Sequence, residues 1–242
     1  MRVLARAADE LALTTVLLFL AVTVVRWLRA PDSPLHIGDL GAALAVIVAP
    51  VRAPITALIL SPPGRRSGGH MNPAVTVALW LMEAFPGRHV APYVVAQLVG
   101  SAAGTGLARL VWGPDAALPT VAYGAIKPAP GWDASSVFVA EVGGMLAVVV
   151  VFGLFLARHA HLLAYVIGVS VGVVIALLGP RSGGSINPAR QFGPALLSGQ
   201  TGALAIYLLA PVLGAVLGAA VHHLLERSGQ LRVTDGPREL RR

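Results

Sequence analysis

The stretch SGGHMNPAV at residues 67–75 returns, little changed, as SGGSINPAR at residues 182–190. Each copy carries Asn-Pro-Ala at its centre, with Asn72 in the first and Asn187 in the second. Asparagine is a preferred N-cap, and proline fits the first helical turn because its missing N–H would have no partner there. Both copies are therefore predicted to be polar loops that lead straight into a helix.

The composition around these two copies is that of a membrane protein. Of 242 residues, 56% are hydrophobic and 12% are charged, whereas soluble domains carry about 25% charged residues. The net charge of +7 comes from basic residues that flank apolar stretches, so nucleic acid is not expected as a partner. The chain has no cysteine, which excludes disulfides and thiol chemistry.

Six apolar stretches approach the roughly 20 residues that an α-helix needs to cross a bilayer. They are predicted to span the membrane at residues 8–28, 38–60, 90–111, 137–157, 162–178 and 203–225. Two further apolar segments, 72–82 and 187–197, begin at the asparagines and are too short to span. They are predicted to be re-entrant half-helices, which survive at membrane depth only when buried in protein or lining a wet cavity.

The chain also reads as an inverted repeat. The segment APYVVAQLVGSAAG at 91–104 aligns with AIYLLAPVLGAVLG at 205–218, and Glu10 in the first span has a counterpart in Glu141 in the fourth. Three spans in each half force the two halves into opposite orientations. We predict one channel domain over 1–225, with repeat one at 8–111 and repeat two at 137–225, followed by a polar cytoplasmic tail at 226–242.

Six spans place both termini on one side of the membrane. With the termini in the cytoplasm, eleven basic residues lie on the cytoplasmic side and six on the other. This distribution satisfies the positive-inside rule. The sequence therefore predicts a multi-pass protein of the cell membrane with both termini cytoplasmic.

In an inverted repeat the two half-helices point their N-termini at each other near the membrane centre. Their partial positive ends repel cations, and the side-chain amides of Asn72 and Asn187 can donate hydrogen bonds into the gap between them. A water molecule in that gap would be held by its oxygen. This arrangement favours passage of neutral molecules.

The paired Asn-Pro-Ala phrases, six spans and half-helices resemble the aquaporin and aquaglyceroporin family, the major intrinsic proteins, over residues 8–225. The resemblance implies that Asn72 and Asn187 form the central filter of a pore and that Arg190 belongs to the outer selectivity filter. It implies that Glu10 and Glu141 accept hydrogen bonds from the re-entrant loops. It also implies a homotetramer with one pore per subunit, and no cofactor or metal is expected.

Two positions of the outer filter depart from the strict water channels of this family, which have a histidine on span five. Counting back from Asn187 puts Ile175 at the histidine position and Gly184 at the loop position. Isoleucine cannot donate a hydrogen bond, and glycine leaves space. Both residues favour a wider and less polar opening.

The span-two position of the filter has two readings. Counting back from Asn72 without a gap puts Arg52 there, where the water channels have an aromatic residue. An insertion in SPPGRR at 61–66 would instead move the position to Val51 or toward Val46. Arg52 would then face a wet vestibule or a protein partner.

Two residues beside the motifs have less definite roles. His70 is either a pore-facing group or a structural histidine, and Gln97 is predicted to bond to loop backbone. Gln191 follows Arg190, where glycerol-conducting relatives typically have Asp and water-selective ones Ser. Gln191 matches neither residue, so this comparison neither confirms nor excludes glycerol as a solute.

The sequence predicts a passive channel for water, with small neutral solutes as further candidates, and a glycerol facilitator as the alternative. A secondary transporter is an alternative of another class, since inverted repeats with broken helices also occur there. Ion coupling would call for ionisable residues near the midplane, where this sequence has asparagines. An enzyme is not expected, because no nucleophile–base pair, metal-ligand spacing or phosphate loop is present.

Overall fold

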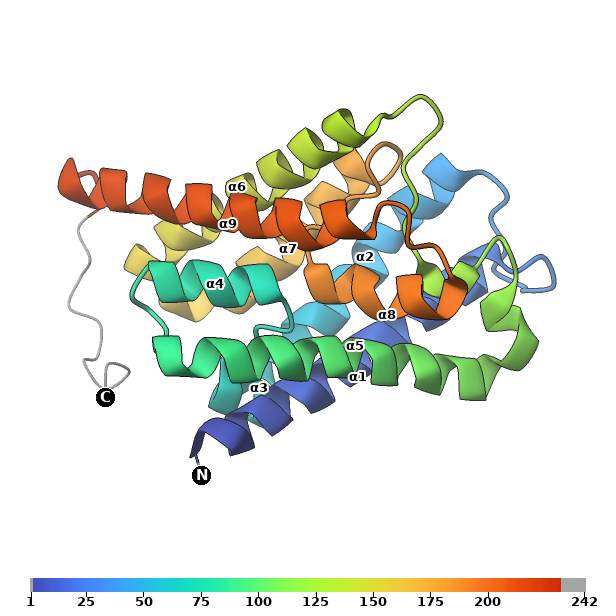
Figure 1. Cartoon of the computed structure of the whole chain (residues 1–242), viewed down its shortest axis with the longest axis horizontal. Helices are drawn as coiled ribbons and strands as arrows, with labels where there is room; N and C mark the ends of the chain where they lie inside the picture. The colour runs from blue at the N-terminus through green and yellow to red at the C-terminus, as the bar shows by residue number, and fades with distance from the viewer. Residues whose placement is uncertain (1, 232–242) are drawn as a thin grey trace.

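A computed structural model shows an all-helical molecule in which long helices surround two short central ones (Figure 1). It describes residues 2–231, except for the side chains of residues 2, 45 and 47–51. The long helices are α1 (Arg2–Arg29), α2 (Leu40–Leu60), α5 (Val90–Trp112), α6 (Ala134–Arg158), α7 (Leu163–Leu178) and α9 (Leu204–Arg227). Each falls on one predicted span, so the predicted all-helical membrane fold is confirmed.

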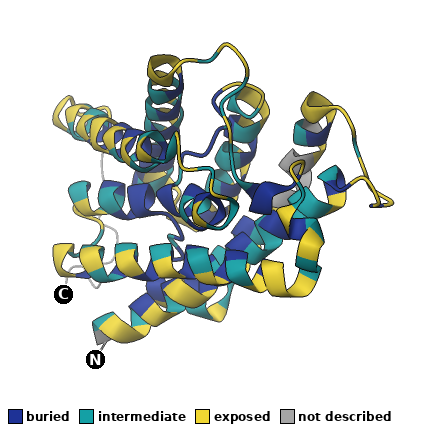
Figure 2. Cartoon of the chain, turned by 45° about the vertical axis from the view of Figure 1, so that its right-hand side comes forward, coloured by how far each residue is buried: buried dark blue, intermediate teal, exposed yellow. Residues whose placement is uncertain are grey.

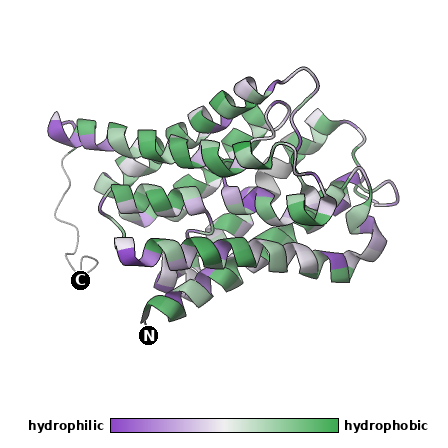
Figure 3. Cartoon of the chain, viewed as in Figure 1, coloured by the Kyte–Doolittle hydropathy of each residue, from purple (hydrophilic) through white to green (hydrophobic). Residues whose placement is uncertain are grey.

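Five of the described helical segments are long and apolar enough to cross a membrane by length and composition, namely those containing α1, α5, α6, α7 and α9. The remaining one, α2, is a helix of 21 residues. Figure 3 shows apolar residues along the long helices and hydrophilic residues gathered toward their ends. The start of α1 and the end of α9 lie at the same end of the molecule (Figure 1).

The two short central helices are the predicted half-helices. They are α4 (Pro73–Leu81) and α8 (Pro188–Ser198), and they lie end to end with their N-termini meeting at the centre (Figure 1). Asn72 caps α4 by accepting a hydrogen bond from the Ala74 amide at 2.8 Å. Asn187 caps α8 through the Ala189 amide at 2.9 Å. Each cap uses one side-chain oxygen to satisfy an amide that the helix itself leaves unpaired.

A short helix that the sequence did not predict precedes the first motif. It is α3 (Pro62–Ser67), which starts with two prolines. Ser61 caps it by accepting a hydrogen bond from the Gly64 amide at 3.2 Å. The segment SPPGRR, interpreted as a possible site of insertion, is therefore a capped helical turn that links α2 to the first re-entrant loop.

Glycines bring the long helices together in matching pairs. Added Cβ atoms at Gly100 and Gly104 of α5 would lie 2.7 and 2.2 Å from backbone oxygens of α1. Added Cβ atoms at Gly214 and Gly218 of α9 would lie 2.4 and 3.3 Å from backbone oxygens of α6. Only glycine permits this approach, so these small residues pack helices of one chain against each other.

The buried core lies between the half-helices and the long helices. Its largest cluster joins α4, α6, α7 and α9 through residues such as Ala78, Met145, Phe152 and Ala215. Buried residues face inward, while the outer faces of the long helices carry many exposed residues, a number of them large and apolar (Figure 2). An apolar outer surface is what a bilayer requires of a spanning bundle.

The predicted tail begins inside a helix. α9 continues to Arg227, and the chain then turns back, so that Arg158 Nη2 donates to the Gln230 carbonyl at 2.6 Å. Leu231 is buried. Residues 232–242 of the predicted tail lie outside the described residues.

Candidate transport pore

The two re-entrant loops have nearly the same backbone path. In both, left-handed φ values recur at three matched positions of the repeated phrase. The pairs are Gly68 and Gly183 (102° and 98°), Gly69 and Gly184 (61° and 60°), and Met71 and Ile186 (48° and 41°). Glycine adopts such angles without a steric penalty, whereas Met71 and Ile186 are held there by surrounding contacts.

Glu10 holds the first loop from α1. Its side chain is fully buried. One carboxylate oxygen accepts from Ser67 Oγ at 2.7 Å and the His70 amide at 3.0 Å; the other accepts from the Met71 amide at 2.7 Å and Gln97 Nε2 at 2.8 Å. A buried carboxylate with four donors fixes the loop backbone. The prediction that Gln97 bonds to loop backbone is wrong, because its amide bonds to the Glu10 carboxylate.

Glu141 holds the second loop from α6 in the same manner. It is also fully buried. Its oxygens accept from Ser182 Oγ at 2.8 Å, the Ser185 amide at 3.1 Å and the Ile186 amide at 2.7 Å. The inverted repeat thus extends to the individual hydrogen bonds that shape each loop.

One buried tyrosine completes each anchor. Tyr93 of α5 donates its hydroxyl to the Ser67 carbonyl at 2.7 Å, and Tyr207 of α9 donates to the Ser182 carbonyl at 2.6 Å. Both tyrosines are fully buried. These residues were visible in the sequence only as a shared letter of the repeat, without a stated role.

The two asparagines cross-link the half-helices. Asn72 Nδ2 donates to the Ile186 carbonyl at 3.1 Å, and Asn187 Nδ2 donates to the Met71 carbonyl at 3.0 Å. An amide nitrogen carries two hydrogens, so each asparagine keeps one donor beyond this bond. Both asparagines line the same central cavity, and each remaining hydrogen can serve as a donor there.

This central cavity has a volume of about 830 Å³. Its wall is mostly apolar, with contributions from α1, α2, α7 and both loops. The ionisable residues in its described wall are basic or histidine and include no Asp or Glu; they are Arg29, Arg65, His70, Lys127, His161 and Arg190. Such a wall is unfavourable for cations.

Three of the four residues expected to form the outer filter lie in the wall of the central cavity. Ile175, Gly184 and Arg190 all line the cavity. Arg190 Nη1 is buried and has no hydrogen-bond partner among the described residues. A Cβ added to Gly184 would point at α7, 3.1 Å from the Val174 carbonyl, and its φ of 60° disfavours any side chain. A larger residue at Gly184 would therefore strain the loop against α7.

Arg52 is not among the residues that line the cavity. Its carbonyl would lie 3.0 Å from a Cβ on Gly168, while Leu44 would lie 3.1 Å from a Cβ on Gly179. Arg52 therefore does not line the cavity. Of the two shifted positions, Val46 does not line it either, and the side chain of Val51 lies outside the described residues.

Two polar contacts between distant parts of the chain were not foreseen. Gln191 Oε1 accepts from the Ile126 amide at 2.9 Å, and its Nε2 donates to the Ile126 carbonyl at 3.0 Å. His223 Nε2 lies 2.8 Å from the Leu81 carbonyl at the end of α4. Both partners are distant in sequence and Ile126 and Leu81 contribute only backbone atoms, so no local motif could reveal them.

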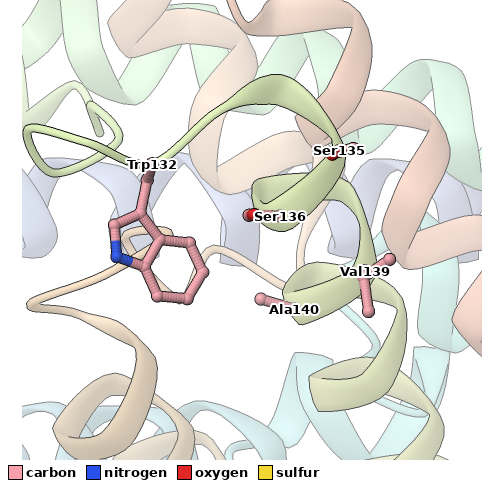
Figure 4. Close-up of a pocket in the computed structure, with 5 residues that line it drawn as sticks. All are labelled: Trp132, Ser135, Ser136, Val139 and Ala140. Carbon is pink, nitrogen blue, oxygen red and sulfur yellow. The ribbon is translucent and has the colours of Figure 1, made fainter.

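A second, smaller pocket lies on the surface at the start of α6, lined by Trp132, Ser135, Ser136, Val139 and Ala140 (Figure 4). Its described wall has no charged side chain. The described residues also contain no group of three or more His, Cys, Asp or Glu arranged to hold a metal ion. The central cavity is thus the candidate site.

Two capped half-helices that meet inside a six-helix inverted repeat, with a cavity along their tips, define a membrane channel. The family profile described as major intrinsic protein matches residues 3–222. The chain belongs to the major intrinsic protein family. It is therefore a multi-pass, non-enzymatic membrane channel.

Known proteins of this family resemble the chain along most of its length. It is 39% identical over 199 residues to the "Probable aquaporin AqpM" of Archaeoglobus fulgidus, covering 79% of this chain and 80% of that one. It is 32% identical over 192 residues to the "Propanediol uptake facilitator PduF" of Citrobacter freundii, covering 66% and 71%. The solved aquaglyceroporin of Plasmodium falciparum shares the fold, with a TM-score of 0.75, 19% identity, and coverage of 95% and 100%.

Proposed function

We propose that this chain is a passive channel for water that also conducts small neutral polyols. The observation that carries the proposal is the crossed asparagine pair. Each amide is fixed by a bond to the opposite loop, at 3.1 and 3.0 Å, and offers its second hydrogen to the cavity. A passing hydroxyl oxygen, from water or from a polyol, can accept both hydrogens.

The wall beyond the asparagines supports a pore wider than that of a strict water channel. Ile175 supplies an apolar side chain where the resemblance would place histidine, and Gly184 has none. An apolar wall opposite fixed donors suits the carbon backbone and hydroxyls of a polyol. The relative from Citrobacter freundii is named for propanediol uptake, which is consistent with this cargo.

Charge argues against the transporter alternative. The described wall of the cavity contains no Asp or Glu, and the half-helix N-termini bring two positive dipole ends together at its centre. A cation-coupled transporter needs a site where the cation is stabilised. We further propose one channel domain over 1–225, cytoplasmic termini and a homotetramer with one pore per subunit.

Stopped-flow light scattering on proteoliposomes tests the proposal. A sucrose jump should cause shrinkage much faster than in empty liposomes, and a glycerol jump should add fast reswelling. Ile175→His should slow the reswelling and leave the shrinkage fast, because it narrows the cavity and adds a polar ring. Fast shrinkage without fast reswelling in the unmodified protein would reduce the proposal to water alone. No acceleration of either would refute it.

A further inference from the structure

The segment that connects the two repeats, residues 113–133, forms part of the cavity. It holds two 3-10 turns, η2 (Gly113–Ala117) and η3 (Ala122–Gly124). Residues 119–122 and 124–127 line the central cavity. Val121 and Tyr123 are buried, so this connecting segment is a packed element of the wall.

Gln191 grips this connecting segment from α8. Its side chain is 1% exposed. Its two amide atoms pair with both backbone groups of Ile126, at 2.9 and 3.0 Å. Only an amide side chain can make both bonds, because a carboxylate has no N–H to donate. An apolar side chain would lose both bonds and leave two backbone groups of Ile126 without partners.

Ile126 is also seated on the second loop. Its Cγ2 lies 1.8 Å from the place where a Cβ on Gly183 would be. Three residues further on, the Ala129 amide donates a hydrogen bond to the Arg181 carbonyl at 2.8 Å, which joins the connecting segment to the start of the second loop. Gln191 and the second loop therefore hold Ile126 between them at the edge of the cavity.

The pairing of Gln191 with Ile126 has no counterpart among the described residues of the first repeat. The residue that matches Gln191 in the first half is Thr76, which donates to the Asn72 carbonyl at 3.1 Å and accepts from Gln97 Nε2 at 3.1 Å. Those bonds stay within the first repeat's own helices and loop. The contact of Gln191 with the connecting segment is thus an addition to the shared scaffold, on the side of the pore that carries Arg190.

We propose that Gln191 is a specificity-determining positioning residue. By holding residues 125–127 in the cavity wall, it sets the width of the outer mouth, the end of the cavity that carries Arg190. This inference rests on the proposed function. Gln191 itself does not line the cavity, whereas Ala125, Ile126 and Lys127 do. Loss of the two bonds frees the segment to withdraw, and polyols larger than glycerol then pass.

The test compares Gln191→Leu with the unmodified channel in proteoliposomes, using water, glycerol and the five-carbon polyol ribitol. The ratio of ribitol to water permeability should rise about tenfold, the lower end of what one methylene makes in a tight site. Ile126→Ala, which keeps the backbone bonds but removes the side chain over Gly183, should raise the ratio less. Asp115→Ala is the control. Asp115 belongs to the same connecting segment, eleven residues before Ile126, but its partner is Arg26, whose Nε donates to it at 3.1 Å.

A purely structural role predicts a different result: water and ribitol permeability would fall together and their ratio would not change. That result in both Gln191→Leu and Ile126→Ala, or an equal rise in Asp115→Ala, overturns the inference while the unmodified channel still conducts water. If Gln191→Leu does not insert, Ile126→Ala decides by the same ratio. An unmodified channel without water flux would overturn the proposed function, and this inference with it.

Discussion

Replacing Glu10 by glutamine should destabilise the fold strongly. The substitution keeps the size of the side chain but removes one hydrogen-bond acceptor. The new amide nitrogen faces two of the four donors, either Ser67 Oγ and the His70 amide or the Met71 amide and Gln97 Nε2. Each buried donor left without a partner costs about 1–3 kcal/mol. Glu10→Gln should therefore lower the free energy of unfolding by about 2–6 kcal/mol.

The neighbouring carboxylate provides the control. Asp9 bonds to Arg66 Nη2 at 2.6 Å, but the Arg66 side chain is 62% exposed. Exposed ion pairs contribute about 0–1 kcal/mol, so Asp9→Asn should change stability little. Both free energies can be measured by denaturant titration of the purified channel in detergent micelles. Equal losses for the two variants would refute the argument that the Glu10 hydrogen bonds fix the first loop.

Three other predictions concern helix contact, acid and thiol reagents. Gly104→Ala should destabilise by about 1–3 kcal/mol, since its Cβ would lie 2.2 Å from the Thr15 carbonyl, whereas Gly106→Ala, with open space, should not; equal thermal shifts would contradict this contact. The hydrogen bond from the Ser136 amide, followed by bonds from Ser135, lowers the pKa of Asp133, so its capping contribution is present above the ordinary carboxyl pKa and is lost as the pH falls through the lowered value. Asp133→Ala should therefore lower the melting temperature at neutral pH but not in strong acid; an effect independent of pH would contradict it. Mercurial reagents should leave water flux unchanged, because the chain has no cysteine; inhibition at low dose would show another mode of attack.

Much of the fold follows from local sequence. Apolar length marks the spans, since about 20 residues are needed to cross the bilayer in any context. Asn72 and Asn187 mark the starts of the half-helices, because a cap and a proline act on the turn that follows them. The repeat then predicts that matched residues, such as Glu10 and Glu141, occupy matched places, and the hydrogen bonds to the two loops show this arrangement.

The pore wall was decided by tertiary structure. Whether Arg52 reaches the filter depends on the register of α2 against α7. Contacts such as the hydrogen bond that Thr56 Oγ1 donates to the Ala164 carbonyl at 3.2 Å set that register. The direction of a Cβ on Gly184 depends on a left-handed backbone angle. The grip of Gln191 on Ile126 joins a side chain to a backbone 65 residues away. Sequence patterns report forces between near neighbours, whereas these features depend on which surfaces meet once the helices pack.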